Sequence, residues 1–502
     1  MSVSGTRGRK LKSWEAAALS IGFMGPLMAV SLNGIGVSSL VGKAVPFVFA
    51  LGFVGVALVA YGFVRLTGRF NHAGSVYALA GLTIGPRAGF IGGFALLGTY
   101  LLFAACTLTA CSVFFQAWVV EAGWSFEPSW ILLPLAAAVL TVVCNLKESR
   151  FTTHLLTYIG GAGVVLMLVL AGVILFKVST GQAPVETGID LSVFSPEGVP
   201  LDSLMAATVF AFLCWAGFES CASLGEETDN PKRAIPMALG GAVVLCGAIF
   251  VFMMFAQTIG FGTSETGVAL FAGSESSITA LAGMYIGKEY ALILAFAAAA
   301  VAFASTLSST AAASRLLFAL ARDGFGPSVL ARVDQKTGVP RPAVVIATVL
   351  SLAITVGHWL AGVTAFDTFY WTATIAVLCL LVAYGTTIIG VVVYILSGRG
   401  GIPKWEVVIP LLGLGFLMYV YFVQAVGQEP PFSYFPWIAG GWCLVGAAIA
   451  IFAPTLARKI GQRLVQQDSL QQDSDAKNPS APLLGAASSA TSNEAGTGQD
   501  KL

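Results

Sequence analysis

Charged side chains are scarce in this chain, and their scarcity excludes a soluble protein. Asp, Glu, Lys and Arg make up only 10% of the 502 residues, whereas about 25% is usual for a soluble domain. Hydrophobic residues make up 57%, and the mean hydropathy is +0.84. Apolar runs of the ~20 residues that span a bilayer recur almost from end to end. The composition therefore predicts an integral membrane protein, which has the lipid bilayer as its surroundings.

The sequence also lacks the residue clusters that metal centres and many enzymes need. Its three histidines, His72, His154 and His358, are isolated from one another. Its eight cysteines lie mostly within apolar runs and form no Cys-x-x-Cys pair. We therefore expect no metal site and no cofactor other than a coupling ion. An enzyme is not expected either, because no group of His, Asp or Cys gathers near one membrane face.

Further classes of protein are excluded by features that are missing. A net charge of +1 argues against a nucleic-acid partner. The stretch GVSSLVGK at 36–43 has one residue too many for a phosphate-binding loop and lacks the following Ser or Thr, so it does not indicate an ATPase. A channel would be expected to have a repeated filter motif or a ring of charged residues, and the sequence shows neither. Once these classes are excluded, the sequence is consistent with a carrier that uses an existing gradient or that exchanges two solutes.

The apolar runs predict an all-α polytopic membrane protein with twelve transmembrane helices. We expect a cytoplasmic N-terminal segment (1–13), a transporter domain (14–457) and a disordered cytoplasmic tail (458–502). With both termini cytoplasmic, all of the 26 Lys and Arg except Lys43, Lys177 and Lys288 fall on the inner side, which favours this topology in the plasma (cytoplasmic) membrane. The predicted helices cover residues 14–41, 46–66, 88–119, 129–146, 153–177, 203–225, 235–260, 288–320, 342–361, 367–397, 405–425 and 434–456.

Two of these predicted helices contain residues that interrupt a helix. The first contains the run SLNGIG at 31–36, and the sixth contains Trp-Ala-Gly at 215–217 just before Glu219. Interruptions at matching places in two halves indicate an inverted repeat. Repeat one would cover about 14–177, repeat two about 203–397, and two further helices about 405–456. The alternative is that these glycines only allow close packing of helices.

An interrupted helix could bind a small substrate without any charged side chain. A break frees backbone NH groups at one new end and carbonyl groups at the other, and the two ends carry opposite dipole charges. A substrate carboxylate could lie on the first helix and an ammonium on the sixth, so a zwitterion fits both. Aromatic rings could stack on the substrate, although aromatic residues in a span more often serve packing. The candidate substrate-binding residues are Ser31, Asn33, Gly34, Ile35, Gly36, Phe210, Phe212, Leu213, Trp215 and Gly217.

Three stretches resemble the amino acid-polyamine-organocation superfamily of permeases. AGFESCASLGEETDNPKRAIP at 216–236 resembles the family's sixth-helix signature, and ASRLLFALARDGFGP at 313–327 resembles its eighth-helix signature. GRFNHAGSVYALAGLTIGPRAGFIGG at 68–93 is similar to its loop between helices two and three. The resemblance extends over most of 14–456. It implies a leucine-transporter-like fold, a 5+5 inverted repeat plus two extra helices, that moves amino acids or related amines by alternating access.

The resemblance adds one candidate substrate-binding residue, and the sequence departs from the family's pattern at two places. Tyr100 becomes a candidate for substrate binding because helix three lines the pathway in resembling structures. Residues 33–37 read Asn-Gly-Ile-Gly-Val where family members commonly read Gly-Ser-Gly-Ile-Phe or Gly-Ala-Gly-Ile-Phe. Helix five has Tyr158-Ile159-Gly160-Gly161 where some proton-coupled relatives carry a lysine, so coupling by such a lysine is excluded.

The coupling ion has two candidate sites. Glu219 matches a glutamate that helps to sense pH in proton-linked members of the resembling family, and a carboxylate at membrane depth is costly unless it has a partner, a cavity or a proton. Its alternative role is structural. Ser308 and Ser309, with Ser305 nearby, match hydroxyls that bind sodium in relatives with this fold. Their alternative role is to hydrogen-bond to their own helix.

The sequence therefore predicts a secondary active transporter of an amino acid or polyamine. Proton-coupled symport is the preferred mechanism, and sodium-coupled symport or exchange is the alternative. A transporter-like nutrient sensor remains a candidate from another class. The sequence does not identify the substrate or the oligomeric state.

Overall fold

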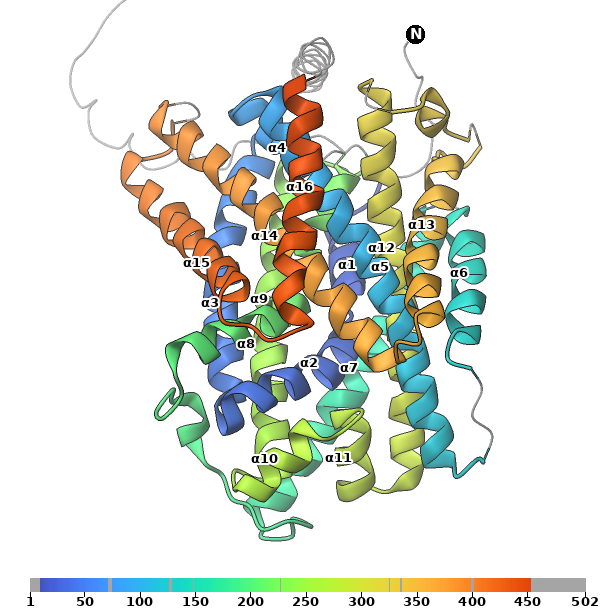
Figure 1. Ribbon diagram of the computed structural model, residues 1–502, viewed down its shortest axis with the longest axis vertical. Coiled ribbons are helices and arrows are strands. Elements are labelled where there is room, and N and C mark those ends of the chain that lie inside the picture. The colour runs from blue at the N-terminus through green and yellow to red at the C-terminus, as the bar shows by residue number, and fades with distance from the viewer. Residues whose placement is uncertain are drawn as a thin grey trace, which may run out of the picture.

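A computed structural model describes residues 10–70, 75–125, 129–147, 149–225, 227–324, 326–334, 336–398 and 401–452. The predicted tail at 458–502 and residues 1–9 lie outside this part of the chain. The described residues are helical apart from turns, loops and one isolated bridge between Leu11 and Thr228 (Figure 1). The helices are α1 (Ser13–Met24), α2 (Pro26–Val41), α3 (Val45–Thr67), α4 (Val76–Thr83), α5 (Pro86–Ala122), α6 (Leu132–Asn145), α7 (Ser149–Ser179), α8 (Leu201–Cys214), α9 (Pro231–Phe261), α10 (Glu265–Ala272), α11 (Ser277–Tyr285), α12 (Lys288–Arg322), α13 (Arg341–Leu360), α14 (Ala365–Leu396), α15 (Val408–Ala425) and α16 (Phe435–Phe452), with a 3-10 helix η3 (Phe218–Leu224).

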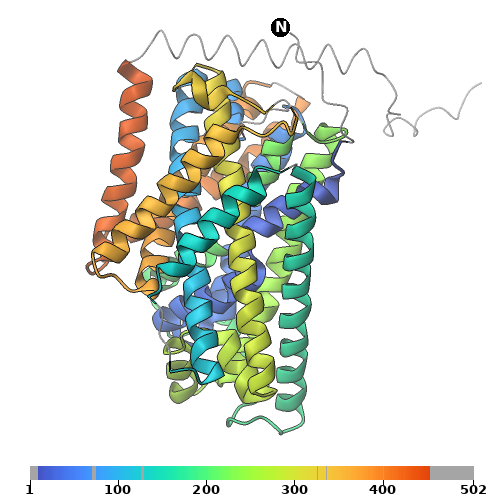
Figure 2. The same ribbon diagram turned by 90° about the vertical axis from the view of Figure 1, so that its right-hand side faces the viewer.

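Long apolar helices form the body of the molecule, so the prediction of an all-helical membrane protein is confirmed. Among the described residues, 10 helical segments are long and apolar enough to cross a membrane. One of them, Ser13–Thr67, is 55 residues long and combines α1, α2 and α3. Figure 2 shows α7, α12 and α13 running alongside one another, and α12 packs on both of the others. Helix α5 lies at the centre, packed against α12 and α14.

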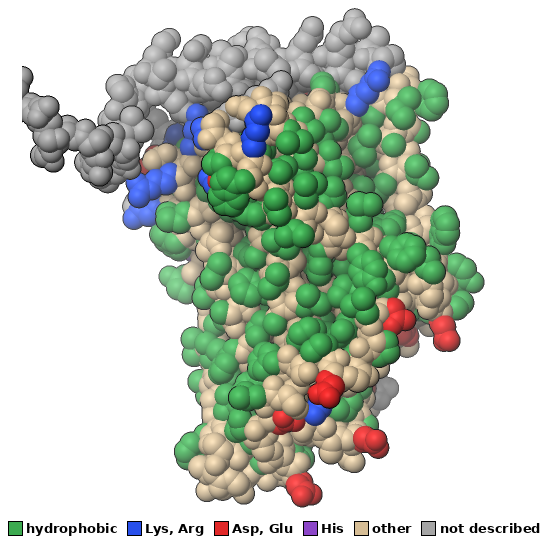
Figure 3. Space-filling view, turned by 90° about the vertical axis from the view of Figure 1, so that its left-hand side faces the viewer, with side chains coloured by type: hydrophobic (Ala, Val, Ile, Leu, Met, Phe, Trp, Pro, Cys, Tyr) green, Lys and Arg blue, Asp and Glu red, His purple; other side chains and the backbone are tan. Residues whose placement is uncertain are grey.

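The face of the bundle in Figure 3 carries charges of mostly one sign at each end. Hydrophobic side chains cover its middle, Lys and Arg predominate at one end, and Asp and Glu predominate at the other, with one basic side chain among them. We call these the basic end and the acidic end. Helix α1 starts and α16 finishes at the basic end, whereas the loop between α10 and α11 lies at the acidic end (Figure 1). An apolar belt between two charged ends is typical of a protein that spans a bilayer.

The first helix is interrupted, but not where the sequence analysis placed the break. Helix α2 runs without a break through Ser31–Gly36. The break lies at Gly25, which has a left-handed φ of 53° and separates α1 from α2. Pro26 begins α2, and a proline is well tolerated there because the first helical NH needs no partner within the helix.

Gly34 does not interrupt the helix, so its predicted role as a helix breaker is wrong. Its missing side chain serves close packing instead. A Cβ atom at Gly34 would lie 2.8 Å from the Met254 sulfur and 2.9 Å from Phe271. The missing side chain therefore lets α2 approach α9 and α10 closely. Close packing was the alternative that the sequence left open for this glycine.

The break predicted in the second half is present. Helix α8 ends at Cys214, residues 215–217 form a turn, and η3 continues the chain from Phe218. Gly217 has a left-handed φ of 87°, a conformation that glycine adopts without the steric cost of a side chain. Its missing side chain also makes room for Phe23 of α1.

We expect Gly217→Ala to destabilise the protein severely. The new Cβ would lie 2.1 Å from the ring of Phe23, and alanine is strained at this positive φ. Overpacking and backbone strain together should cost about 2 to 5 kcal/mol. Thermal unfolding in detergent would measure the loss, with Gly241→Ala of α9, where no atom lies within 4 Å, as the matched control. Equal melting temperatures for the two variants would contradict this packing.

Candidate functional site

The two breaks face each other across the middle of the bundle. The Ser20 hydroxyl of α1 donates a hydrogen bond to the Phe218 carbonyl at 2.7 Å and accepts one from the Cys221 amide at 3.1 Å. Phe23 lies beneath Gly217 and stacks on Phe103 of α5, with ring centroids 4.7 Å apart. Ser20 thus joins α1 to the first turn of η3.

A second set of contacts joins α2 to the end of α8. The Asn33 amide donates to the Ala29 carbonyl at 3.0 Å and to the Cys214 sulfur at 3.3 Å. Its carbonyl oxygen is buried without a hydrogen-bond partner. The Tyr370 hydroxyl of α14 donates to the Leu32 carbonyl at 2.6 Å. Asn33 therefore has one unused acceptor beside the second break, where a substrate donor could bind.

Glu219 is fully buried and links three elements. The Tyr100 hydroxyl of α5 donates to one carboxylate oxygen at 2.7 Å, and the Tyr384 hydroxyl of α14 donates to the other. Protonation of Glu219 would turn one of its oxygens into a hydroxyl, which is a weaker acceptor and a new donor, so the hydrogen bond to that oxygen would weaken or reverse. Glu219 is thus in direct contact with α5 and α14 as well as with its own segment.

The candidate sodium residues of α12 lie near the end of α1. The Ser305 hydroxyl donates to the Phe23 carbonyl, and Ser308 lies against Gly22. The Ser308 hydroxyl donates to the Ala304 carbonyl at 3.2 Å, and the Ser309 hydroxyl donates to the Ser305 carbonyl at 2.9 Å. All three hydroxyls have partners, which is the arrangement expected of residues that serve helix packing.

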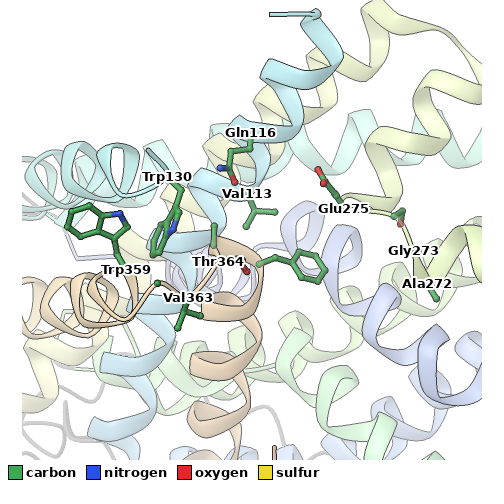
Figure 4. Close-up of a pocket in the computed structure, with 13 residues that line it drawn as sticks. Val113, Gln116, Trp130, Ala272, Gly273, Glu275, Trp359, Val363 and Thr364 are labelled. Carbon is green, nitrogen blue, oxygen red and sulfur yellow. The ribbon is translucent and has the colours of Figure 1, made fainter. Parts of the chain in front are cut away.

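Two adjoining cavities lie between the breaks and the acidic end. The smaller, which we call the inner cavity, has a volume of ≈ 290 Å³. Three of the predicted substrate-binding residues line it: Ile35, Gly36 and Phe210, together with Tyr370 and Asp367. The larger, which we call the outer cavity, has a volume of ≈ 680 Å³ and lies between α5, the α10–α11 loop and the α13–α14 loop (Figure 4).

Other predicted residues are buried beside these cavities rather than on them. The ring of Trp215 stacks on Phe53 of α3 with centroids 6.2 Å apart, and its NH has no partner. Phe212 stacks on Phe416 of α15. Ser31 donates to the Leu27 carbonyl of its own helix. The remaining predicted residues, Leu213, Gly217 and Tyr100, are buried at the second break and in α5.

The basic end is closed by contacts between distant parts of the chain. Leu11 forms backbone hydrogen bonds with Glu227 and Asp229, at 3.0 and 2.9 Å. Arg315 of α12 lies 3.2 Å from the Glu227 carboxylate. Tyr77 of α4 donates a hydrogen bond to Asp323 at 2.8 Å. Among the described residues, these contacts join α1, α4 and α12 to neighbouring segments at the basic end, whereas the inner and outer cavities lie toward the acidic end.

Comparison with known proteins identifies the family. The profile of the family "Amino acid permease" matches residues 16–428, which is most of the chain. The chain belongs to the amino acid permease family. Members of this family are membrane transporters, so the permease is a transporter and not an enzyme.

The permease is also similar to several characterised transporters. It is 24% identical over 335 residues to a low-affinity putrescine importer of Escherichia coli strain K12, covering 66% of this chain and 72% of the relative. It is 26% identical over 364 residues to cationic amino acid transporter 3 of Arabidopsis thaliana, covering 68% and 57%. It is 28% identical over 354 residues to an aromatic amino acid transport protein of E. coli K12, covering 66% and 71%.

Sequence reasoning missed several residues of the site. Tyr384 could have been suspected, because a buried tyrosine hydroxyl in an apolar helix needs a partner. Ser20 and Phe23 gave no local signal, since their partners in η3 lie about 200 residues away in the sequence. These contacts of the permease depend on which helices the fold brings together.

We expect Ser20→Ala to loosen the second break. The substitution removes two buried hydrogen bonds that join α1 to η3, at a cost of about 1 to 3 kcal/mol. The melting temperature should fall clearly below that of Ser39→Ala, a control that removes an exposed hydroxyl bonded within its own helix. A Ser20→Ala variant as stable as this control would contradict the assigned role.

Proposed function

We propose that the permease carries an amino acid or a related amine across the plasma membrane by alternating access, as a proton-coupled symporter. The observation that carries the proposal is the place of Glu219. This carboxylate belongs to the interrupted segment, is removed from water, and bonds to Tyr100 of α5 and Tyr384 of α14. A proton taken up there changes the hydrogen bonds that hold three moving parts together, which is the requirement for coupling.

The order of the helices supports twelve spans in a 5+5 repeat. Helices α1 to α7 would form repeat one and α8 to α14 repeat two, with α15 and α16 as the two extra spans. In this arrangement Ser13–Thr67 crosses twice and the 14-residue α6 crosses once. Each repeat then begins with an interrupted helix, α1–α2 or α8–η3. In each repeat short helices also follow the second span: α4 after α3, and α10 and α11 after α9. Such correspondence is typical of inverted repeats.

The charge distribution supports an orientation with both termini in the cytoplasm. Lys and Arg are enriched in the cytoplasmic loops of membrane proteins, so the basic end would face the cytoplasm and the acidic end the outside. The contacts of Leu11, Glu227 and Arg315 would then close the cytoplasmic side, and the two cavities would open outward. This is one of the two states that alternating access requires.

The substrate would bind where the two breaks meet. The chain leaves its regular helix at Gly25 and at residues 215–217, and the Asn33 oxygen and the Trp215 NH lie beside the second break without hydrogen-bond partners among the described residues. An ammonium can bind to carbonyl groups at the end of α8, and a carboxylate can bind to NH groups at the start of α2. The proposed site would lie on the side of the inner cavity toward the basic end, and the substrate would reach it from outside through this cavity.

A proton is favoured over sodium as the coupling ion. The hydroxyls of Ser305, Ser308 and Ser309 all donate to carbonyl groups, an arrangement that helix packing alone explains. Glu219 is the ionisable group that the structure places at a break. Sodium coupling, exchange and a sensor without transport are the other outcomes that the following experiment would detect.

We expect Glu219→Gln to separate transport from proton coupling. In proteoliposomes a pH difference of one unit stores about 1.4 kcal/mol, enough for a roughly tenfold accumulation of substrate with one proton. The wild type should approach this accumulation, whereas Glu219→Gln should carry substrate only to equal concentrations. Labelled amino acids and polyamines are the substrates to test.

The controls distinguish the competing mechanisms. Glu15→Gln, which removes a buried carboxylate near the start of α1, should keep accumulation driven by the pH difference. Accumulation that follows a sodium gradient and persists in Glu219→Gln would contradict the proposed coupling. The absence of uptake for every amino acid and amine, under either gradient, would contradict transport itself.

A further inference from the structure

The outer cavity combines features that none of the residues considered so far explains. Its volume of ≈ 680 Å³ is that of a small-molecule site. Two tryptophans, Trp130 and Trp359, line one side, and Glu275 of the α10–α11 loop lies across the cavity with Gln116 of α5 between them (Figure 4). The outer cavity, which is open to the outside of the molecule, is therefore lined by two large aromatic rings and a carboxylate.

Trp130 packs partly against the hydrophobic core, whereas Trp359 is more exposed. Within the part of the chain that the structure describes, neither indole ring stacks on another aromatic ring, and the carboxylate of Glu275 has no ion pair or hydrogen-bond partner. A positively charged group is attracted both to a carboxylate and to the face of a tryptophan ring. Indole rings and an unpaired carboxylate that line the same cavity from opposite sides can together recognise an organic cation.

The surroundings favour a cation over an anion. Of the described residues that line the two cavities, none is Lys, Arg or His. Three lysines lie near the acidic end, and none of them lines either cavity. Lys177 donates to the Tyr285 carbonyl at 2.6 Å, Lys43 lies 3.5 Å from Asp190, and Lys288 lies beside Gly123. Hydrogen bonds from Ser192 lower the pKa of Asp190, the partner of Lys43.

The outer cavity also leads toward the proposed substrate site. Ala272 and Phe366 line both the outer and the inner cavity, so the two volumes adjoin at these residues. The inner cavity carries a second carboxylate, Asp367, and reaches Gly36 and Phe210. A cation that leaves Glu275 would thus meet another carboxylate on the way inward.

We propose that the outer cavity is a binding site for organic cations, and that the transported substrate carries an alkylammonium or guanidinium group and a net positive charge. This inference rests on the proposed transport function and specifies its substrate class. Diamines and basic amino acids share the required chemistry. A neutral amino acid would gain less, because its carboxylate would meet Glu275 and Asp367 without a cationic side chain to balance them.

Equilibrium binding to the purified full-length permease tests the site without depending on transport. Labelled putrescine and labelled arginine represent the two sources of the cation, and labelled leucine is the neutral probe. In Glu275→Gln the Kd of putrescine, arginine or both should rise about three- to tenfold. Glu265→Gln, an exposed carboxylate of α10 that lines neither cavity, is the matched control and should leave the Kd unchanged.

The aromatic contribution is tested separately. Trp359→Ala should raise the same Kd about two- to fivefold, and Trp359→Phe should recover part of the loss because it restores an aromatic face. Binding of the cation to the wild type should also weaken as ionic strength rises, while binding of leucine should not. This last measurement needs no variant, so it remains decisive if a substitution prevents folding.

The results separate the two proposals. Equal cation binding by Glu275→Gln and Glu265→Gln, or wild-type binding of leucine alone, would overturn the cation site even if uptake occurs. Cation binding that weakens in Glu275→Gln, without uptake of any substrate, would support the site and contradict transport. Stronger binding of arginine than putrescine would assign basic amino acids as the source, and the reverse would assign diamines.

Discussion

An interrupted helix inside a membrane must find partners for the backbone groups that its break sets free, and this requirement organises the permease. Lipid offers no hydrogen bonds, so each free amide or carbonyl has to be satisfied by protein, by water in a cavity or by a ligand. Ser305 satisfies the Phe23 carbonyl at the end of α1, and Ser20 joins α1 to the first turn of η3. Among the described residues, Asn33 and Trp215 each keep one buried polar atom without a partner beside the second break, and our proposal assigns these atoms to the substrate.

The same arrangement relates binding to movement. Glu219 follows the second break directly, and its two tyrosine partners come from α5 and α14, which pack on each other at the centre of the bundle. A change at the breaks therefore reaches the helices that border both cavities. At the other end, Leu11 and Arg315 attach α1 and α12 to the loop after η3, so opening of the basic end would require the interrupted helices to move.

The sequence was sufficient for the parts of this fold that depend on local composition. The apolar runs predicted the helices, and Gly217 predicted the second break because a glycine precedes a buried carboxylate there. The first break was misplaced: Asn33 and Gly34 looked more disruptive than Gly25, although a glycine followed by proline is itself a boundary signal. Gly34 is explained only by the side chains of α9 and α10 that it approaches. Partners such as Tyr384 could not be assigned, because they depend on tertiary packing.

A structure of the permease with its transported substrate bound would test directly whether the substrate binds at the interrupted helices. We expect the substrate to lie between the two breaks, with a charged group within hydrogen-bonding distance of backbone groups near Gly25 or residues 215–217. We also expect the Tyr100 and Tyr384 contacts to Glu219 to differ from those described above once the proton is bound. A transported substrate that binds away from both breaks, and leaves α1–α2 and α8–η3 packed as they are in its absence, would contradict binding at the interrupted helices.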